Sequence, residues 1–302
     1  MAEETHVIRL TSGHVSEALS RQALGSIPHH QLARFLAGRR WFGAKARACR
    51  DARVATVLAF PWPDGPFALA VVEVDRDDGR TALYQLPLTA REAGDGQKGT
   101  GEPTAAVLAT VESVGGRALI SDATGDEAFR RHLAEAILRG TTVEAAGIRW
   151  VAEPVNASPE ARLTVATSRL GSAEQSNSSI IYGDGSGDVA ILKLFRRIEP
   201  GESPDIEIAR FLATRTDFRN TPELLGTIRL EFGYGEPSAA GMLSRFVPST
   251  GDAWSHALDR VRAYLAAPAK REPSNPFAAE ARELGRVTRA LHEALASDEV
   301  DP

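Results

Sequence analysis

An apolar run at residues 188–195, interrupted by a single lysine, constrains the fold of this chain more than any other feature. Eight residues rich in Val, Ile, Leu and Phe predict a buried strand. Only four of the 35 basic residues are lysines, and Lys193 lies inside this run. A lysine ammonium is a compact, rotatable charge that suits a phosphate, whereas the arginine guanidinium is a rigid fork. Lys193 is therefore either a phosphate ligand or a cation on an edge strand that points to solvent.

The segments on both sides of this run alternate between strand patterns and turns. In chain order the predicted elements are a strand at 162–169, a small polar loop at 171–179, a strand at 180–182, a glycine-rich turn at 183–187, the lysine-bearing strand, a helix from Ser203 and strands at 227–232 and 241–246. The helix is expected at Ser203-Pro204 because serine caps helices and proline suits their first turn.

This order of elements is typical of the N-terminal lobe of protein kinases. In such a lobe a loop of small residues approaches the nucleotide phosphates with backbone N–H groups and hydroxyls. Lys193 is then expected to contact the α and β phosphates, and Glu207 on the following helix to pair with Lys193. Residues 243–248 fall where a kinase hinge offers backbone groups to adenine. The predicted phosphate loop comprises Ser176, Asn177, Ser178 and Ser179.

Each of these signals also has a simpler interpretation. Glu207 lies three residues before Arg210, and such a surface pair stabilises a helix by only about 0.2–0.5 kcal/mol. Serine and asparagine are common in ordinary turns, so residues 175–179 alone do not identify a phosphate loop. The order and spacing of the elements, rather than any single residue, favour the kinase-like interpretation.

Composition limits the class of protein. The chain has 302 residues, which predicts two or three compact units, and its 43% apolar and 25% charged residues are ordinary for a globular protein. A net charge of −5 predicts no attraction to nucleic acid or to an anionic membrane. Cys49 is the single cysteine, which excludes an internal disulfide, and no apolar run reaches the roughly 18 residues of a membrane helix. We therefore expect a soluble, cytoplasmic protein.

The N-terminal part predicts a small α+β unit ahead of the kinase-like one. Helical spacing at 30–38 precedes Trp41 and Phe42, which we expect to anchor a core or, alternatively, to form an exposed docking patch. Gly-rich and polar residues 91–104 predict a loop or linker. A helix at 126–139 is predicted to end at Gly140. The predicted strands lie at 53–60, 67–75, 81–86, 106–112 and 117–121.

Six sequence blocks, taken together, resemble bacterial maltokinase. They are Arg39-Arg40-Trp41-Phe42-Gly43-Ala44-Lys45, Glu174-Gln175-Ser176-Asn177-Ser178-Ser179, residues 191–197, residues 204–208, Phe246-Val247-Pro248 with residues 251–254, and residues 284–292. The resemblance implies an ATP-dependent kinase that phosphorylates the anomeric hydroxyl of maltose, which feeds α-glucan synthesis downstream of trehalose. It also implies a protein-kinase-like fold similar to that of aminoglycoside phosphotransferases, with an additional cap on the N-lobe.

The implied fold class is α+β. The expected parts are a maltokinase N-terminal cap over residues 1–100, a kinase N-lobe-like domain over 101–247, and a helical linker with the start of a C-lobe over 248–302. The cofactor that the resemblance implies is ATP, accompanied by Mg²⁺. Matched by position to the family, the implied nucleotide-binding residues are Lys193, Glu207, Ser176, Asn177, Ser178 and Ser179, with Ser244 and Phe246 at the hinge.

The sequence departs from the family in one respect. Neither a His-Gly-Asp nor an Asp-Phe-Glu block, which would supply the catalytic aspartate and the Mg²⁺ ligands, occurs in the chain. We therefore expect at most nucleotide binding, without phosphoryl transfer, by this chain alone, and maltose binding only when a C-lobe is supplied. Two alternatives stay open: a non-catalytic module that docks on trehalose synthase or a full-length kinase, and half of a related glucosamine kinase.

Two apolar helical stripes near the C-terminal end are predicted to lack a partner. In the family, helices of the C-lobe would cover them. We therefore expect an exposed apolar patch that drives association or local disorder. The first stripe contains Trp254, Leu258, Val261 and Leu265, and the second contains Leu284, Leu291 and Leu295.

Overall fold

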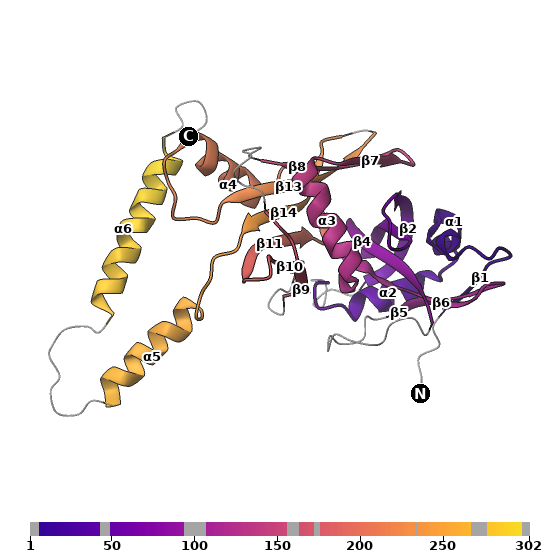
Figure 1. Cartoon of the computed structure of the whole chain (residues 1–302), viewed down its shortest axis with the longest axis horizontal. Helices are drawn as coiled ribbons and strands as arrows, with labels where there is room; N and C mark the ends of the chain where they lie inside the picture. The colour runs from indigo at the N-terminus through magenta and orange to yellow at the C-terminus, as the bar shows by residue number, and fades with distance from the viewer. Residues whose placement is uncertain are drawn as a thin grey trace.

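The computed structural model describes residues 6–42, 49–93, 107–155, 163–171, 176–233, 235–266 and 277–297. Over these ranges the chain forms two seven-stranded sheets and a helix, α3 (Figure 1). Side chains of α3 share one core with both sheets. Two further helices, α5 and α6, extend away from the sheets at the C-terminal end (Figure 1).

The first sheet comes mainly from the N-terminal part of the chain and has the order β1-β5-β6-β4-β3-β2. Short helices cover one of its faces, where Leu36, Trp41 and Phe42 are buried, so the two aromatic residues anchor a core as predicted. The strands are β1 (His6–Arg9), β2 (Cys49–Phe60), β3 (Phe67–Arg76), β4 (Thr81–Glu92), β5 (Val107–Ser113) and β6 (Gly116–Asp122). The helices are η1 (Val15–Leu19), α1 (Arg21–Gly25) and α2 (His29–Ala37).

The first sheet extends further along the chain than the predicted cap. Strands β5 and β6 both follow residue 100, where the sequence predicts the boundary with the next domain. That boundary therefore falls inside the first sheet, and the structural division comes after Asp122. The polar composition of residues 91–104 marks a connection between strands of one sheet; residues 94–106 lie outside the described part of the chain.

Helix α3 (Glu127–Arg139) forms where the sequence predicts it. The Asp126 side chain accepts the N–H of Phe129 at 3.2 Å, and Gly140 ends the helix with a left-handed φ of 71°. The apolar side of the helix contributes to the core that the two sheets share. From the second sheet, Tyr182 donates its hydroxyl to the carbonyl of Arg130 at 3.0 Å, and so fixes the helix on that side.

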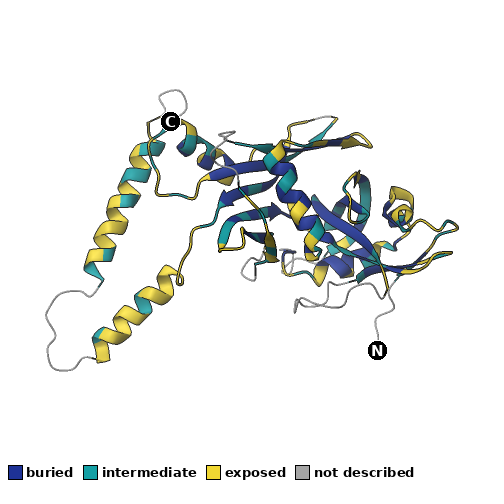
Figure 2. Cartoon of the chain, viewed as in Figure 1, coloured by how far each residue is buried: buried dark blue, intermediate teal, exposed yellow. Residues whose placement is uncertain are grey.

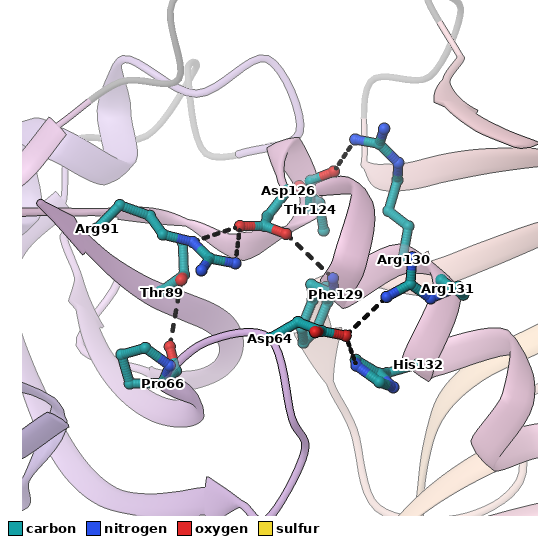
Figure 3. A network of polar contacts seen from close by, with 10 residues as sticks. All are labelled: Asp64, Pro66, Thr89, Arg91, Thr124, Asp126, Phe129, Arg130, Arg131 and His132. Atoms are coloured by element: carbon teal, nitrogen blue, oxygen red, sulfur yellow. Dashed lines mark hydrogen bonds and ion pairs between the residues drawn. The ribbon is translucent and has the colours of Figure 1, made fainter. Parts of the chain in front are cut away.

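Polar contacts hold α3 against the first sheet (Figure 3). Arg91 on β4 donates from Nε and Nη2 to one carboxylate oxygen of Asp126, at 2.8 and 2.6 Å. Asp64, in the turn between β2 and β3, accepts from Arg131 at 2.7 Å and contacts Nε2 of His132 at 3.2 Å. The first turns of α3 are therefore tied to two separate segments of the first sheet.

The second sheet is antiparallel, with the order β7-β8-β13-β14-β11-β10-β9. Five of its strands and helix α4 have the predicted order along the chain. This order is two strands, the lysine-bearing strand, a helix and two more strands. The α+β fold class of a cap followed by a kinase-like lobe is thereby confirmed. The elements are β7 (Thr142–Ala145), β8 (Ile148–Pro154), β9 (Thr167–Leu170), β10 (Asn177–Gly183), β11 (Asp188–Phe195), α4 (Pro204–Arg215), β13 (Leu224–Phe232) and β14 (Ser238–Arg245). A two-residue strand, β12 (Arg197–Ile198), leaves the second sheet and pairs with β4 of the first.

Helices α5 (Ala253–Ala266) and α6 (Ala278–Leu295) contain no buried residue, and Figure 2 shows both mainly in the colours of exposed and half-buried residues. The exposed fraction is 73% for Trp254, 60% for Leu265 and 62% for Leu284. The predicted exposure therefore holds for Trp254, Val261, Leu265 and Leu284, whereas Leu258, Leu291 and Leu295 are half-buried.

In the described residues, no helix has both the length and the apolarity that crossing a membrane requires.

Candidate nucleotide site

Strand β11 has one face in the shared core and the other on the opposite side of the second sheet. Alternate residues of β11 point to opposite faces, and Ala190, Leu192 and Leu194 are buried in the shared core. Ile191 and Lys193 therefore lie on the other face, where both are only partly buried. This placement excludes Lys193 from the core and puts its ammonium beside α4.

Strand register brings a row of residues next to Lys193. Ser179 of β10 and Met242 of β14 lie directly opposite Lys193, so their side chains share its face of the sheet. Gly171 donates its N–H to the carbonyl of Ser179 at 2.8 Å and so extends the row to the end of β9. A Cβ atom at Gly171 would approach the Cβ of Ser179 to 3.1 Å, so glycine keeps the space over Ser179 open.

The carboxylate that Lys193 contacts is that of Asp205. Nζ of Lys193 lies 2.6 Å from Oδ2 of Asp205, with side-chain exposures of 34% and 53%. Asp205 belongs to the first turn of α4, where the helix dipole favours a negative charge. The expected partner Glu207 lies two residues further along α4 and is exposed. Among the described residues the predicted pairing is therefore corrected from Glu207 to Asp205.

The predicted phosphate loop is shorter than expected, because β10 already begins at Asn177. Ser176 alone of the four predicted residues precedes the strand. Ser178 accepts a hydrogen bond from Arg196 at 2.8 Å, on the side of the sheet away from Lys193. Ser179 is 6% exposed, and its hydroxyl has no hydrogen-bond partner in the described ranges. Residues 172–175, which connect β9 to β10, lie outside the described residues.

The predicted hinge follows the last strand of the sheet. Ser244 lies within β14 opposite Ile191 and is buried, so it belongs to the same face as Lys193. Phe246 follows the strand, and its N–H donates to the carbonyl of Val189 at 3.0 Å. That N–H is therefore committed to the protein, and the backbone of 247–248 is the part of the predicted hinge that lies beyond this bond.

A charged turn fixes β10 relative to β11. The Asp184 carboxylate accepts from the N–H of Ser186 at 2.8 Å, from its hydroxyl at 2.7 Å and from the N–H of Gly187 at 3.1 Å. These hydrogen bonds hold the pKa of Asp184 below its ordinary value. On the core side of the same hairpin, burial raises the pKa of Tyr182, which therefore stays a neutral hydrogen-bond donor.

Sequence reasoning missed two buried residues that contact the site from behind. Arg196 and Gln85 are each 1% exposed and join the first sheet to β10, β11 and β14. A pattern of local spacing does not reveal them, because their partners are up to 155 residues away in the chain. The one available signal is a basic residue directly after an apolar strand.

Comparison with known proteins identifies the first unit. Residues 35–126 match the family described as the maltokinase N-terminal cap domain. Over these residues the chain is similar to a maltokinase cap. The match ends close to Asp122, the last residue of the first sheet, and so agrees with the structural boundary of the cap rather than with residue 100.

Solved structures of glucosamine kinase are similar to part of the chain. A complex with glucosamine, ADP and inorganic phosphate is 23% identical with a TM-score of 0.47, and covers 82% of this chain and 47% of its own. A second glucosamine kinase structure, crystal form A, is 21% identical with a TM-score of 0.47, and covers 88% of this chain and 52% of its own. The chain thus spans about half the length of the solved kinases it matches.

Proposed function

We propose that this chain is the cap and nucleotide-binding lobe of an ATP-dependent sugar kinase of the maltokinase type. The observation that carries the proposal is the ion pair between Lys193, on the third strand of the lobe, and Asp205, on the helix that follows. Protein kinases use this arrangement to hold a lysine extended toward the α and β phosphates. The maltokinase-like cap supports the choice of a sugar kinase.

The residues around Lys193 suit a nucleotide. Ile181, Ile191 and Met242 are partly buried on the Lys193 face and would contact the flat apolar adenine. The unpartnered hydroxyl of Ser179, next to the space that Gly171 leaves, would donate to a phosphate oxygen. ATP would supply the phosphoryl group, while Asp205 would orient the Lys193 ammonium toward the α and β phosphates.

We assign no Mg²⁺ ligand. In the described residues no three His, Cys, Asp or Glu side chains come together at one point. Because the sequence contains neither a His-Gly-Asp nor an Asp-Phe-Glu block, we expect this chain to bind nucleotide without transferring the phosphoryl group. The proposed acceptor, in the presence of a C-lobe, is the anomeric hydroxyl of maltose; glucosamine, the sugar in the solved kinase complex, is the alternative.

Isothermal titration calorimetry with Mg-ATP tests the proposal. We expect the chain to bind, the Lys193→Ala variant to lose the heat signal, and the control Arg53→Ala, which removes a surface cation of the cap, to bind like the parent. Absence of binding by the parent chain, or equal binding by Lys193→Ala, would contradict a nucleotide site at Lys193.

A non-catalytic docking module is the second candidate, and the exposed apolar residues of α5 and α6 favour it. The proposed partner is trehalose synthase or a full-length kinase. In that case purified trehalose synthase should bind the parent chain and Lys193→Ala equally, because docking would not use the phosphate site. Loss of the complex in Lys193→Ala would argue against this candidate.

A further inference from the structure

A buried arginine connects the cap to the back of the candidate nucleotide site. Arg196 directly follows β11, and its guanidinium lies 4.5 Å above the ring of Trp41. Nη2 contacts the Asp122 carboxylate at 2.8 Å and donates to the Thr124 hydroxyl at 3.1 Å. Nε donates to the Ser178 hydroxyl at 2.8 Å. One side chain thus joins the end of the cap sheet to the first residues of β10.

A buried glutamine of the cap makes a second connection. The Nε2 amide of Gln85 donates to the carbonyls of Phe195 and Ala240, at 2.6 Å each. These carbonyls lie where β11 and β14 separate, just beyond the paired residues Leu194 and Gly241. The backbone N–H of Gln85 also donates to the Arg196 carbonyl at 2.8 Å. Cap strand β4 therefore holds β11 and β14, the strands that carry Lys193 and Met242, just beyond their last shared pair.

The polar contacts of Arg196 fix the position of β10 relative to the cap more than they stabilise the fold. Burial lowers the pKa of Arg196, and Asp122 offsets part of that effect, which reflects the cost of placing a guanidinium away from water. An apolar side chain would fill such a space without this cost, so a buried ion pair is weak evidence for stability. Its hydrogen bonds are directional, however, and they set the distance between Asp122 and Ser178.

The Ser178 hydroxyl, which accepts from Arg196, belongs to the residue just before Ser179 on β10. Ser178 and Ser179 are consecutive on β10, so they point to opposite faces, Ser178 toward the cap and Ser179 toward Lys193. A shift of Ser178 therefore moves Ser179 in the same strand.

We propose that Arg196 is a positioning residue through which the cap holds the start of β10, and with it the Ser179–Lys193 row, in the geometry that binds nucleotide phosphates. The expected effect on nucleotide affinity rests on the proposed function. The connection between the cap and β10 does not.

The test uses the full chain and changes the cap end of the connection. Asp122→Asn keeps the size of the side chain but removes its charge, and Ser178→Ala removes the acceptor at the other end. Arg197→Ala is the matched control, because this adjacent arginine is 47% exposed and pairs with Glu199 at the surface. The readouts are hydrogen exchange of the amides at 177–183 without nucleotide, and the Kd for Mg-ATP.

We expect Asp122→Asn to accelerate exchange at 177–183 and to weaken Mg-ATP binding by about five- to tenfold, within the usual range of coupling between two sites. Arg197→Ala should change neither. In the Ser178→Ala background, Asp122→Asn should have little further effect on either quantity, because the connection is already cut.

Unchanged exchange and unchanged affinity in a folded Asp122→Asn protein would overturn the proposal. Additive effects of Asp122→Asn and Ser178→Ala would also overturn it, since two residues on one connection cannot act independently. If no variant and not even the parent binds Mg-ATP, the proposed function fails, while the exchange data still decide whether the cap and β10 are coupled.

Discussion

At the residue scale, the candidate site depends on which carboxylate holds Lys193. Lys193 and the helix that supports it were both predictable, because an isolated lysine in an apolar strand and a Ser-Pro helix start are local signals. The choice between Asp205 and Glu207 was not, because both lie in the first turn of α4 and differ only in rotation about its axis.

The Asp205→Asn substitution should weaken Mg-ATP binding by about two- to fivefold, because a partly exposed ion pair contributes at most about 1 kcal/mol. Glu207→Gln, on the same turn of the same helix, is the control and should leave the Kd unchanged. Calorimetric titration of both variants measures the difference. The reverse ranking would restore Glu207 as the partner.

At the element scale, close packing between α3 and β13 depends on a glycine. A Cβ atom at Gly226 would collide with Cγ2 of Ile137 on α3 and would lie 2.8 Å from the carbonyl oxygen of Glu153. The sequence predicted both elements, but it did not show that the Ile137 side chain of α3 packs onto the backbone of β13 at this point. Glycine is common in strands for several reasons, and only the neighbouring helix identifies this one.

Gly226→Ala should lower the free energy of unfolding by about 1–3 kcal/mol, the usual cost of forcing extra volume into a packed core. Gly187→Ala is the control, because a Cβ atom there would meet no atom within 4 Å. Urea denaturation followed by tryptophan fluorescence compares the two. Equal stability of both variants would mean that α3 can move away from β13 without cost.

The exposed stripes of α5 and α6 give a second prediction at this scale. Because Trp254 and Leu265 are 73% and 60% exposed, the chain should self-associate at micromolar concentrations, and the Trp254→Ser/Leu265→Ser double variant should shift it toward monomer. Arg262→Ser, which changes an exposed polar residue of the same helix, should not. Sedimentation velocity reports the mass; a parent chain that stays monomeric would refute the idea.

At the scale of the whole molecule, the two sheets are joined by a shared core and by buried polar contacts. Carboxylates paired with arginines also connect strands within each sheet. Hydrogen bonds from Arg229 hold the pKa of Glu231 below its ordinary value, with a further contribution from Arg149. Hydrogen bonds from Thr81 and Arg53 lower the pKa of Asp75 in the cap.

Stability should therefore fall in acid. A carboxylate whose pKa is lower in the folded than in the unfolded state stabilises the fold above its unfolded pKa, and that contribution is lost as the pH falls through the folded value. We expect the unfolding temperature to decrease from about pH 5 to pH 3. Differential scanning calorimetry should show a smaller acid loss in Glu231→Gln than in the parent; identical pH profiles would exclude a contribution from Glu231.

The sequence by itself determined the order of elements in the kinase-like lobe, the position of Lys193 and the resemblance of the cap to maltokinase. Local periodicity, capping residues and short motifs specify those features. Tertiary structure alone decided that the cap continues to Asp122, that Asp205 holds Lys193 and that Arg196 joins the cap to β10. The reason is physical: these contacts join residues distant in the chain, or choose between neighbours on one helical turn, and local spacing specifies neither.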